Sequence, residues 1–219
     1  MAWSDRSMSS IAGTPAMSDA PDTLAIGPGW ARAVCDIVER HLAGGASASA
    51  IEAMRSRLLE LAFRADCPQA DSLYAAGDVS RYSRHQLVAE PDIGYSCLLI
   101  QWPAGHATPL HDHDGLWGIE LVLDGALQVE EFRKDESPGS DGLAHARTLV
   151  LGVGDAAAFA DPRYVHRCRN LSARKPALSL HVYGGLLERF NTFEPDVAGR
   201  YQPSRYVTRL DSVAGLAGI

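Results

Sequence analysis

Two histidines, His111 and His113, stand on either side of Asp112 in the largely apolar stretch GHATPLHDHDGLWGIELVLDG, residues 105–125. Side chains two positions apart on a strand point to the same face, so both imidazoles can converge on one metal ion. A single H-x-H pair also occurs often by chance, and the pair alone leaves a structural role equally open. The surrounding sequence has to decide between these two interpretations.

The spacing around this pair resembles the first motif of the cupin superfamily, G-x5-H-x-H-x3,4-E-x6-G. Gly105 precedes the first histidine by six residues and Gly125 follows the second by twelve. The motif glutamate would fall at position 118, where this sequence has Gly118. Glu120 lies close by, and the sequence leaves open whether it approaches a metal or has a structural role.

A second segment, GDAAAFADPRYVHRCRN at residues 154–170, resembles the second cupin motif. His166 and Asn170 have its H-x3-N spacing. The match is imperfect, because one extra residue separates Gly154 from His166 and Arg163 replaces a motif glycine. The two motifs together imply three imidazole ligands for one ion, namely His111, His113 and His166.

Three neutral imidazoles without a protein carboxylate leave the full positive charge on a divalent ion. Imidazole suits iron, copper, nickel and zinc alike, so the ligand type alone does not name the metal. An octahedral ion with three protein ligands retains three open positions. A substrate thiolate is a natural occupant, because a dipositive ion deprotonates a coordinating thiol. The chemistry expected from the sequence therefore depends on a site made of imidazoles alone.

The pattern S-x-H-x-Y in PALSLHVYG narrows the resemblance to the cysteine dioxygenase family, cupins with a three-histidine Fe(II) centre that convert a small thiol and O2 into the sulfinic acid. The resemblance covers most of residues 80–195. It implies that Ser179, His181 and Tyr183 form a hydrogen-bonded relay, and on a strand all three would share one face. Without the neighbouring metal motif, such alternation would indicate only a solvated face.

The segment RYSRHQL resembles the part of these enzymes that holds the substrate carboxylate. The resemblance assigns Arg84 to the carboxylate, which a planar guanidinium can bind with two hydrogen bonds, and Tyr82 to a supporting role. An exposed edge-strand arginine is the competing interpretation. Some bacterial relatives that act on 3-mercaptopropionate have Gln at this position, so Arg84 favours cysteine without settling the substrate. Animal members have a crosslinked cysteine where this chain has Gly118, so Tyr183 is expected to stay unmodified.

The resemblance implies an iron-dependent thiol dioxygenase whose partners are O2 and a small thiol carboxylate, L-cysteine first. Alternatives are a dioxygenase for 3-mercaptopropionate or mercaptosuccinate, and a cupin that binds a small ligand without catalysis. A manganese or zinc isomerase or lyase is less favoured, since those enzymes usually retain the glutamate that Gly118 replaces. Trp102 and Trp117 are candidates for the cavity wall or for core packing. A monomer and a homodimer both remain open.

The elements that position these residues are predominantly β-strands. From Tyr82 onward, eight short runs rich in β-branched and aromatic residues are separated by Pro, Gly and Asp, which predicts a cupin-type β-barrel or jelly roll. Apolar residues at helical spacing predict an N-terminal helical segment at residues 28–76. Residues 1–27 are expected to form a flexible tail. The helical segment, a barrel at 80–195 and an irregular C-terminal extension at 196–219 then make up a single cupin domain over 28–219.

Composition argues against several classes of partner. The net charge of −7 offers no cationic field to nucleic acid or to an anionic membrane surface. The sequence contains no apolar run of the ~18 residues that a membrane span needs. Four scattered cysteines without C-x-x-C pairing predict reduced thiols and a cytoplasmic protein.

Overall fold

The computed structural model describes residues 26–71, 73, 80–135, 142–197 and 199–213. Most of the tail predicted at 1–27 therefore lies outside the described residues. Within the described part, no helix is both long enough and apolar enough to span a bilayer.

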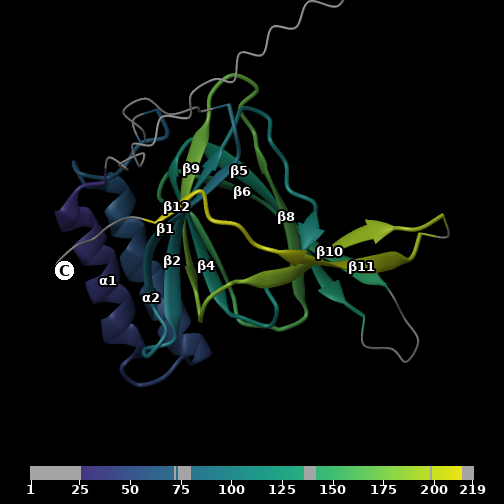
Figure 1. Ribbon diagram of the computed structural model, residues 1–219, viewed down its shortest axis with the longest axis horizontal. Helices are drawn as coiled ribbons and strands as arrows, with labels where there is room; N and C mark the ends of the chain where they lie inside the picture. Colours follow the sequence, from purple (N-terminus) through teal and green to yellow (C-terminus); the bar gives the residue numbers. More distant parts are fainter. Residues whose placement is uncertain (1–25, 72, 74–79, 136–141, 198, 214–219) are drawn as a thin grey trace, which may run out of the picture.

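Two helices precede the strands, as the sequence predicted. Helix α1 (Pro28–Leu42) begins at a proline, a residue that suits the first turn of a helix because it lacks an N–H that would need a partner there. Helix α2 (Ala48–Leu58) is capped by Ser47, whose Oγ accepts a hydrogen bond from the Ala50 N–H at 3.1 Å. A 3₁₀ turn, η1 (Leu59–Phe63), follows directly. Figure 1 shows both helices packed along one side of the β-structure.

Twelve strands in the described residues form two six-stranded sheets. In spatial order the first sheet contains β12 (Ser212–Val213), β1 (Ser83–Glu90), β2 (Tyr95–Trp102), β9 (Ala177–Tyr183), β4 (Gly118–Asp124) and β7 (Ala156–Phe159). The second contains β11 (Tyr201–Val207), β10 (Arg189–Pro195), β3 (Leu110–His111), β8 (Tyr164–Asn170), β5 (Ala126–Lys134) and β6 (Leu143–Gly152). All of these pairings are antiparallel except β1 with β12.

The central strands of the first sheet are buried on both faces, and the two faces differ in chemistry. On β4 and β9, Leu121 and Leu180 point outward and join the apolar cluster that includes helix residues such as Trp30. Because side chains alternate along a strand, their neighbours Glu120 and His181 point inward, towards the second sheet. The helices thus cover one face with hydrophobic contacts, while the other face is free to carry polar groups.

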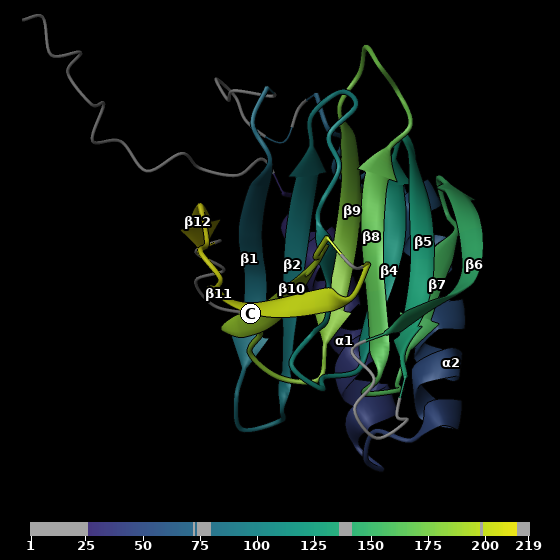
Figure 2. The same ribbon diagram turned by 90° about the vertical axis from the view of Figure 1, so that its right-hand side faces the viewer.

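The predicted mainly β, cupin-type fold with N-terminal helices is confirmed. The two sheets face each other as in a jelly roll and do not close into one continuous barrel. Figure 2 shows the β10–β11 hairpin running across the direction of the strands of the first sheet. The sequence analysis expected an irregular extension after residue 195, but this segment contains β11 and β12, which extend the two sheets at their edges.

Candidate metal centre

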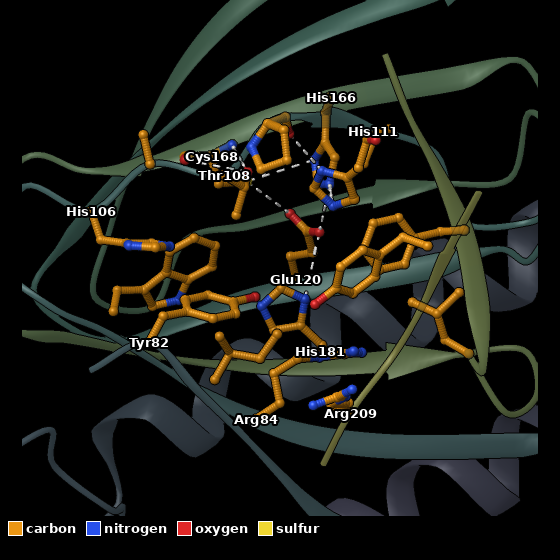
Figure 3. Close-up of a pocket in the computed structure, with 18 of the residues that line it drawn as sticks. Tyr82, Arg84, His106, Thr108, His111, Glu120, His166, Cys168, His181 and Arg209 are labelled. Carbon is orange, nitrogen blue, oxygen red and sulfur yellow. Dashed lines mark hydrogen bonds and ion pairs between the residues drawn. The ribbon is translucent and has the colours of Figure 1, made fainter. Parts of the chain in front are cut away.

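A cavity of about 380 Å³ lies between the two sheets. Arg84 on β1, Glu120 on β4 and Tyr183 on β9 line it from the first sheet, and His111 on β3 and His166 on β8 line it from the second. Figure 3 shows the labelled side chains pointing into this common space. Residues far apart in the chain therefore share one compartment, because their strands lie in the same sheet or in two sheets that face each other.

His111 and His166 are neighbours because β3 and β8 pair in that register. Their Nε2 atoms are 3.1 Å apart. Imidazole–metal bonds of about 2.0–2.1 Å place two adjacent ligands of an octahedral ion roughly 3 Å apart. The pair is thus already spaced as two ligands of one ion.

His113 reaches the same place by a route that the sequence did not predict. Strand β3 ends at His111, so His113 lies in the following loop. The loop is held by Asp112, whose carboxylate accepts hydrogen bonds from the Asn191 N–H at 2.8 Å and from Lys134 Nζ at 2.7 Å. Asp112 thus anchors the segment, in which His111 lines the cavity and a ring nitrogen of His113 lies within 4.8 Å of the ligand atoms of His111 and His166.

The His113 ring has two buried nitrogens without a hydrogen-bond partner in the described part of the chain. Buried polar atoms normally have hydrogen-bond partners, so two buried nitrogens without a partner in one ring need an explanation. The ligand atoms of His111, His113 and His166 all lie within 4.8 Å of one another. A bound metal ion would give His113 its missing partner, so these residues form a metal-binding group.

The histidines are in the protonation state that a metal requires. The His111 Nδ1–H donates to the Pro109 carbonyl at 2.9 Å, which leaves the Nε2 lone pair facing the other ligands. Burial lowers the pKa of His111, and it lowers those of His113 and His166 well below the usual value. Neutral imidazoles bind metal without first losing a proton.

Ser179, His181 and Tyr183 form the predicted chain of hydrogen bonds. Ser179 Oγ lies 2.8 Å from His181 Nε2, and His181 Nδ1 lies 3.0 Å from the Tyr183 hydroxyl. Trp102 adds a link, since its Nε1–H donates to Ser179 Oγ at 2.8 Å.

One direction of this relay satisfies each of its partners. Indole only donates, so the Ser179 hydroxyl accepts from Trp102 and can donate its own proton to His181 Nε2. The Glu120 carboxylate, which only accepts, lies 3.5 Å from His181 Nδ1 and favours a proton on that nitrogen. His181 then carries its proton on Nδ1 and donates it to the Tyr183 oxygen. The Tyr183 O–H is left to donate into the cavity.

Arg84 and Tyr82 are also at the cavity, as the sequence predicted. The Arg84 N–H donates a hydrogen bond to the Asp211 carboxylate, and the Arg84 carbonyl accepts one from the Asp211 N–H. The residue is only 8% exposed. Its guanidinium has no hydrogen-bond or ion-pair partner in the described ranges. The Tyr82 ring stacks on His106, with centroids 4.6 Å apart. A buried cation without a partner suits an anionic group on a ligand.

The cysteine dioxygenase type I family matches residues 31–196, three quarters of the chain. The chain belongs to the cysteine dioxygenase type I family. Cysteine dioxygenase type 1 from Danio rerio is 29% identical over 127 residues, which is 58% of this chain and 63% of the relative. The Homo sapiens protein of the same name is 27% identical over 123 residues, 56% of this chain and 60% of the relative. The match thus spans less than two thirds of these curated relatives.

The solved structures that are similar to this one include an oxalate oxidase in complex with the substrate analogue glycolate. It has a TM-score of 0.39 and 19% identity, covering 50% of this chain and 55% of that one. The DMSP lyase DddQ from Ruegeria pomeroyi has a TM-score of 0.37 and 20% identity, covering 52% and 53%. The family assignment rests on the sequence match and not on these structures.

Gly118, a position that matters in the cysteine dioxygenase family, gives room to an aromatic ring. A Cβ at this position would lie 2.4 Å from Cζ of Phe159. Phe159 uses the space to stack on His113, with ring centroids 4.3 Å apart. A cysteine at this position would require Phe159 to move. Gly118 therefore offers Tyr183 no sulfur and leaves room for the ring that stacks on His113.

Among the cavity residues that were not assigned from the sequence are Cys168, Thr108 and Arg209. Alternation along β8 could have found Cys168, two positions after His166. Arg209 comes from the C-terminal extension and carried no signal. Of the two tryptophans considered for the wall, Trp102 lines the cavity, whereas Trp117 packs over Gly184.

Glu120, whose distance from the metal-binding group the sequence left open, lies beside these histidines. Its Oε1 lies 3.4 Å from His166 Nε2, 3.9 Å from His113 Nε2 and 3.5 Å from His181 Nδ1. Burial alone would raise the pKa of Glu120, but a hydrogen bond from the His181 ring stabilises the ionised carboxylate, and the net shift is downward. The expected all-imidazole site thus has a carboxylate beside it.

Proposed function

We propose that this protein is a thiol dioxygenase that converts a small thiol carboxylate, L-cysteine first, and O2 into the sulfinic acid. Fe(II) is the proposed metal, with His111, His113 and His166 as its ligands. The observation that carries the proposal is the convergence of three neutral imidazoles, two of which line a cavity that also holds an unpaired buried arginine. Bound Fe(II) would supply the redox chemistry for the reaction of O2 with a thiolate.

Arg84 gives the substrate its orientation. Its guanidinium would bind the substrate carboxylate with two charge-assisted hydrogen bonds, and this would direct the thiol end towards the histidines. The Asp211 carboxylate and the paired backbone of β1 keep Arg84 in place before the substrate arrives. Tyr82, which stacks on His106 and contacts Trp102 edge-on, would support the same end of the substrate.

Tyr183 would act as a hydrogen-bond donor to the reacting groups. The order of donors from Trp102 through Ser179 and His181 leaves its O–H pointing into the cavity. Burial raises the pKa of Tyr183 well above its usual value, so the phenol keeps its proton at neutral pH. A donor held in advance costs little reorganisation during the reaction.

Apolar side chains would limit water at the site. Ile100, Leu187 and Phe190 line the cavity between the polar groups. With less water present, the interactions of Arg84 and Tyr183 with an anionic substrate are stronger. The proposal includes a cytoplasmic monomer or homodimer, and four unpaired cysteines support the reducing compartment.

The function is tested by anaerobic purification with metal analysis, followed by O2 uptake with cysteine, 3-mercaptopropionate and mercaptosuccinate in parallel. We expect thiol-dependent O2 uptake and a product heavier than the thiol by two oxygen atoms. Tight thiol binding without O2 uptake for any of the three would replace the proposal with a ligand-binding protein.

Mercaptosuccinate is the second candidate substrate because the cavity contains a second arginine. Arg209 lines the same cavity as Arg84, and Figure 3 shows both on one side of it. Two guanidinium groups match two carboxylates better than one. The highest kcat/KM in the three-thiol comparison decides between the candidates.

Replacing Tyr183 with Phe should slow turnover while the metal content stays unchanged. The change removes one hydrogen bond to a charged group, which is worth about 1.5–3 kcal/mol, or roughly ten- to hundredfold in kcat. Steady-state O2 uptake and metal analysis measure the two quantities. Tyr201→Phe, a half-buried tyrosine on β11 outside the cavity, is the control and should leave kcat unchanged. Loss of metal in Tyr183→Phe would mean that this tyrosine acts on the fold and not on the reaction.

A further inference from the structure

Four polar residues lie opposite one another on four neighbouring strands of the second sheet. His111 on β3 pairs with His166 on β8. His166 in turn pairs with Glu131 on β5, which pairs with Arg147 on β6. Directly opposite residues of antiparallel strands have their side chains on one face, with Cβ atoms about 4.5–5.5 Å apart. The row therefore runs from the candidate metal ligands to β6, the last strand of this sheet in the described part of the chain.

Tyr164 connects this row to the back of the His166 ring. It lies two positions before His166 on β8, so its side chain is on the same face. The Tyr164 hydroxyl oxygen is 3.3 Å from His166 Nδ1 and 3.4 Å from Glu131 Oε1. The tyrosine is 8% exposed, and its ring stacks on Phe159 with centroids 4.3 Å apart. Packing therefore holds the hydroxyl between the imidazole and the carboxylate.

The hydrogen bonds of this group have one consistent direction when His166 is a metal ligand. Its Nε2 faces His111 Nε2 at 3.1 Å, so Nε2 is the ligand atom and the ring proton is on Nδ1. The Nδ1–H then donates to the Tyr164 oxygen, and the Tyr164 O–H donates to Glu131, which only accepts. Cys168 Sγ also lies 3.6 Å from Nδ1, but a thiol sulfur is a weak acceptor. The phenol oxygen is therefore the main acceptor for His166.

An arginine at the surface holds the far end of the group. Arg147 Nη2 donates to Glu131 Oε1 at 3.1 Å, and Arg147 Nε donates to Oε2. The Glu131 side chain is 8% exposed, whereas that of Arg147 is 57% exposed. A buried carboxylate needs such a cation, and two parallel hydrogen bonds fix its orientation beside Tyr164. A charge at the surface is thus linked to a buried ligand ring through Glu131 and Tyr164.

We propose that Tyr164 and Glu131 are positioning residues that hold the His166 ring in the orientation and tautomer in which Nε2 binds the metal. The inference rests on the metal site of the proposed function and leaves its three ligands unchanged. A partner on the far nitrogen of a ligand imidazole fixes the ring and makes the ligand nitrogen more basic. His111 has the Pro109 carbonyl in this role, whereas His166 has a phenol backed by a carboxylate.

The test is the affinity of the substrate-free protein for Co(II), measured by competition with a chelator, in wild type, Tyr164→Phe and Glu131→Gln. Phenylalanine keeps the stacking on Phe159 and removes only the hydroxyl. Loss of an outer partner of a metal ligand lowers metal affinity roughly 10–100-fold, and we expect a loss in that range for Tyr164→Phe. The double variant should bind Co(II) about as weakly as Tyr164→Phe alone, because both changes interrupt one chain of hydrogen bonds.

Glu130→Gln is the matched control for Glu131→Gln. Glu130 is the preceding residue on β5, so its side chain is on the opposite face, where it pairs with Arg167. Its Co(II) affinity should stay within about twofold of wild type, since an exposed ion pair contributes little. Tyr201→Phe removes a hydroxyl on β11 outside the cavity and should likewise leave Co(II) affinity unchanged.

A second measurement reports on the His166 ring itself. In the Co(II) protein, the exchangeable N–H protons of the ligand histidines give proton NMR signals far outside the usual range. One of these signals should shift and exchange faster with water in Tyr164→Phe, whereas the Glu130→Gln spectrum should match wild type. A general loss of packing would not act on a single N–H in this way.

The inference is overturned if Tyr164→Phe binds Co(II) as tightly as wild type, if its N–H signals are those of wild type, or if the losses of the two single variants add in the double variant. If His166→Ala also leaves Co(II) affinity unchanged, the metal site of the proposed function fails with it. If His166→Ala alone loses the metal, the proposed function stands and only the role of Tyr164 and Glu131 is rejected.

Discussion

His166→Ala should abolish thiol-dependent O2 uptake and reduce metal content to background. The His166 ring lies between His111 and Glu120 and is 1% exposed, so the substitution removes a buried nitrogen from the middle of the proposed ligand group. Outer partners of metal ligands already contribute roughly 10–100-fold to affinity, so removal of a ligand should cost at least the upper end of that range. Metal analysis of the purified variant and O2 uptake with cysteine measure both effects.

His145→Ala is the control for this substitution. His145 is an exposed residue on β6 in the second sheet, and its Nε2 lies 3.0 Å from Thr148 Oγ1. It is not among the residues that line the cavity. It should retain metal and rate. Circular dichroism establishes that both variants are folded. Full metal content and an unchanged rate in folded His166→Ala would refute the ligand assignment.

Much of the site could be predicted because period-two alternation is readable from sequence. Ser179, His181 and Tyr183 share a face of β9 as alternation requires, and their hydrogen bonds follow from that face. Glu120 could not be placed in the same way, since its distance to His166 depends on how far apart the two sheets lie. Arg209 depends on a segment distant in sequence that folds back over the cavity, and no local pattern encodes such a return.

The strands also differ in how well the sequence predicted them. Strands β2, β4 and β9 were predictable because they are buried on both faces and so consist mainly of apolar residues. Strands β10 and β11 are largely exposed, and their sequences RFNTFEP and YQPSRYV alternate only weakly. Their hydrogen bonds to each other and to β3 supply the structure that the pattern does not indicate. The position of His111 depends on this pairing, since β3 itself contains only two residues.

Arg84→Ala should lower kcat/KM for thiols that carry a carboxylate by roughly 30-fold or more. Two charge-assisted hydrogen bonds are lost, and even one is worth about 1.5–3 kcal/mol, with each 1.4 kcal/mol giving a factor of ten. Metal content should not change, because Arg84 lies at the other end of the substrate from the histidines. Steady-state O2 uptake over a range of cysteine concentrations measures the effect. Arg174→Ala, at an exposed loop arginine, is the matched control and should behave as wild type.

A substrate without a carboxylate separates recognition from a defect in the fold. Cysteamine retains the amine and the thiol of cysteine, so its kcat/KM should be similar in wild type and Arg84→Ala. Selectivity for cysteine over cysteamine would then fall by about the same factor as kcat/KM for cysteine. An equal loss with both thiols would contradict the assignment, because it would mean that Arg84 supports β1 through Asp211 and does not hold the carboxylate. The buried guanidinium predicts the first result, since it has no ion-pair partner among the described residues and the substrate carboxylate would supply one.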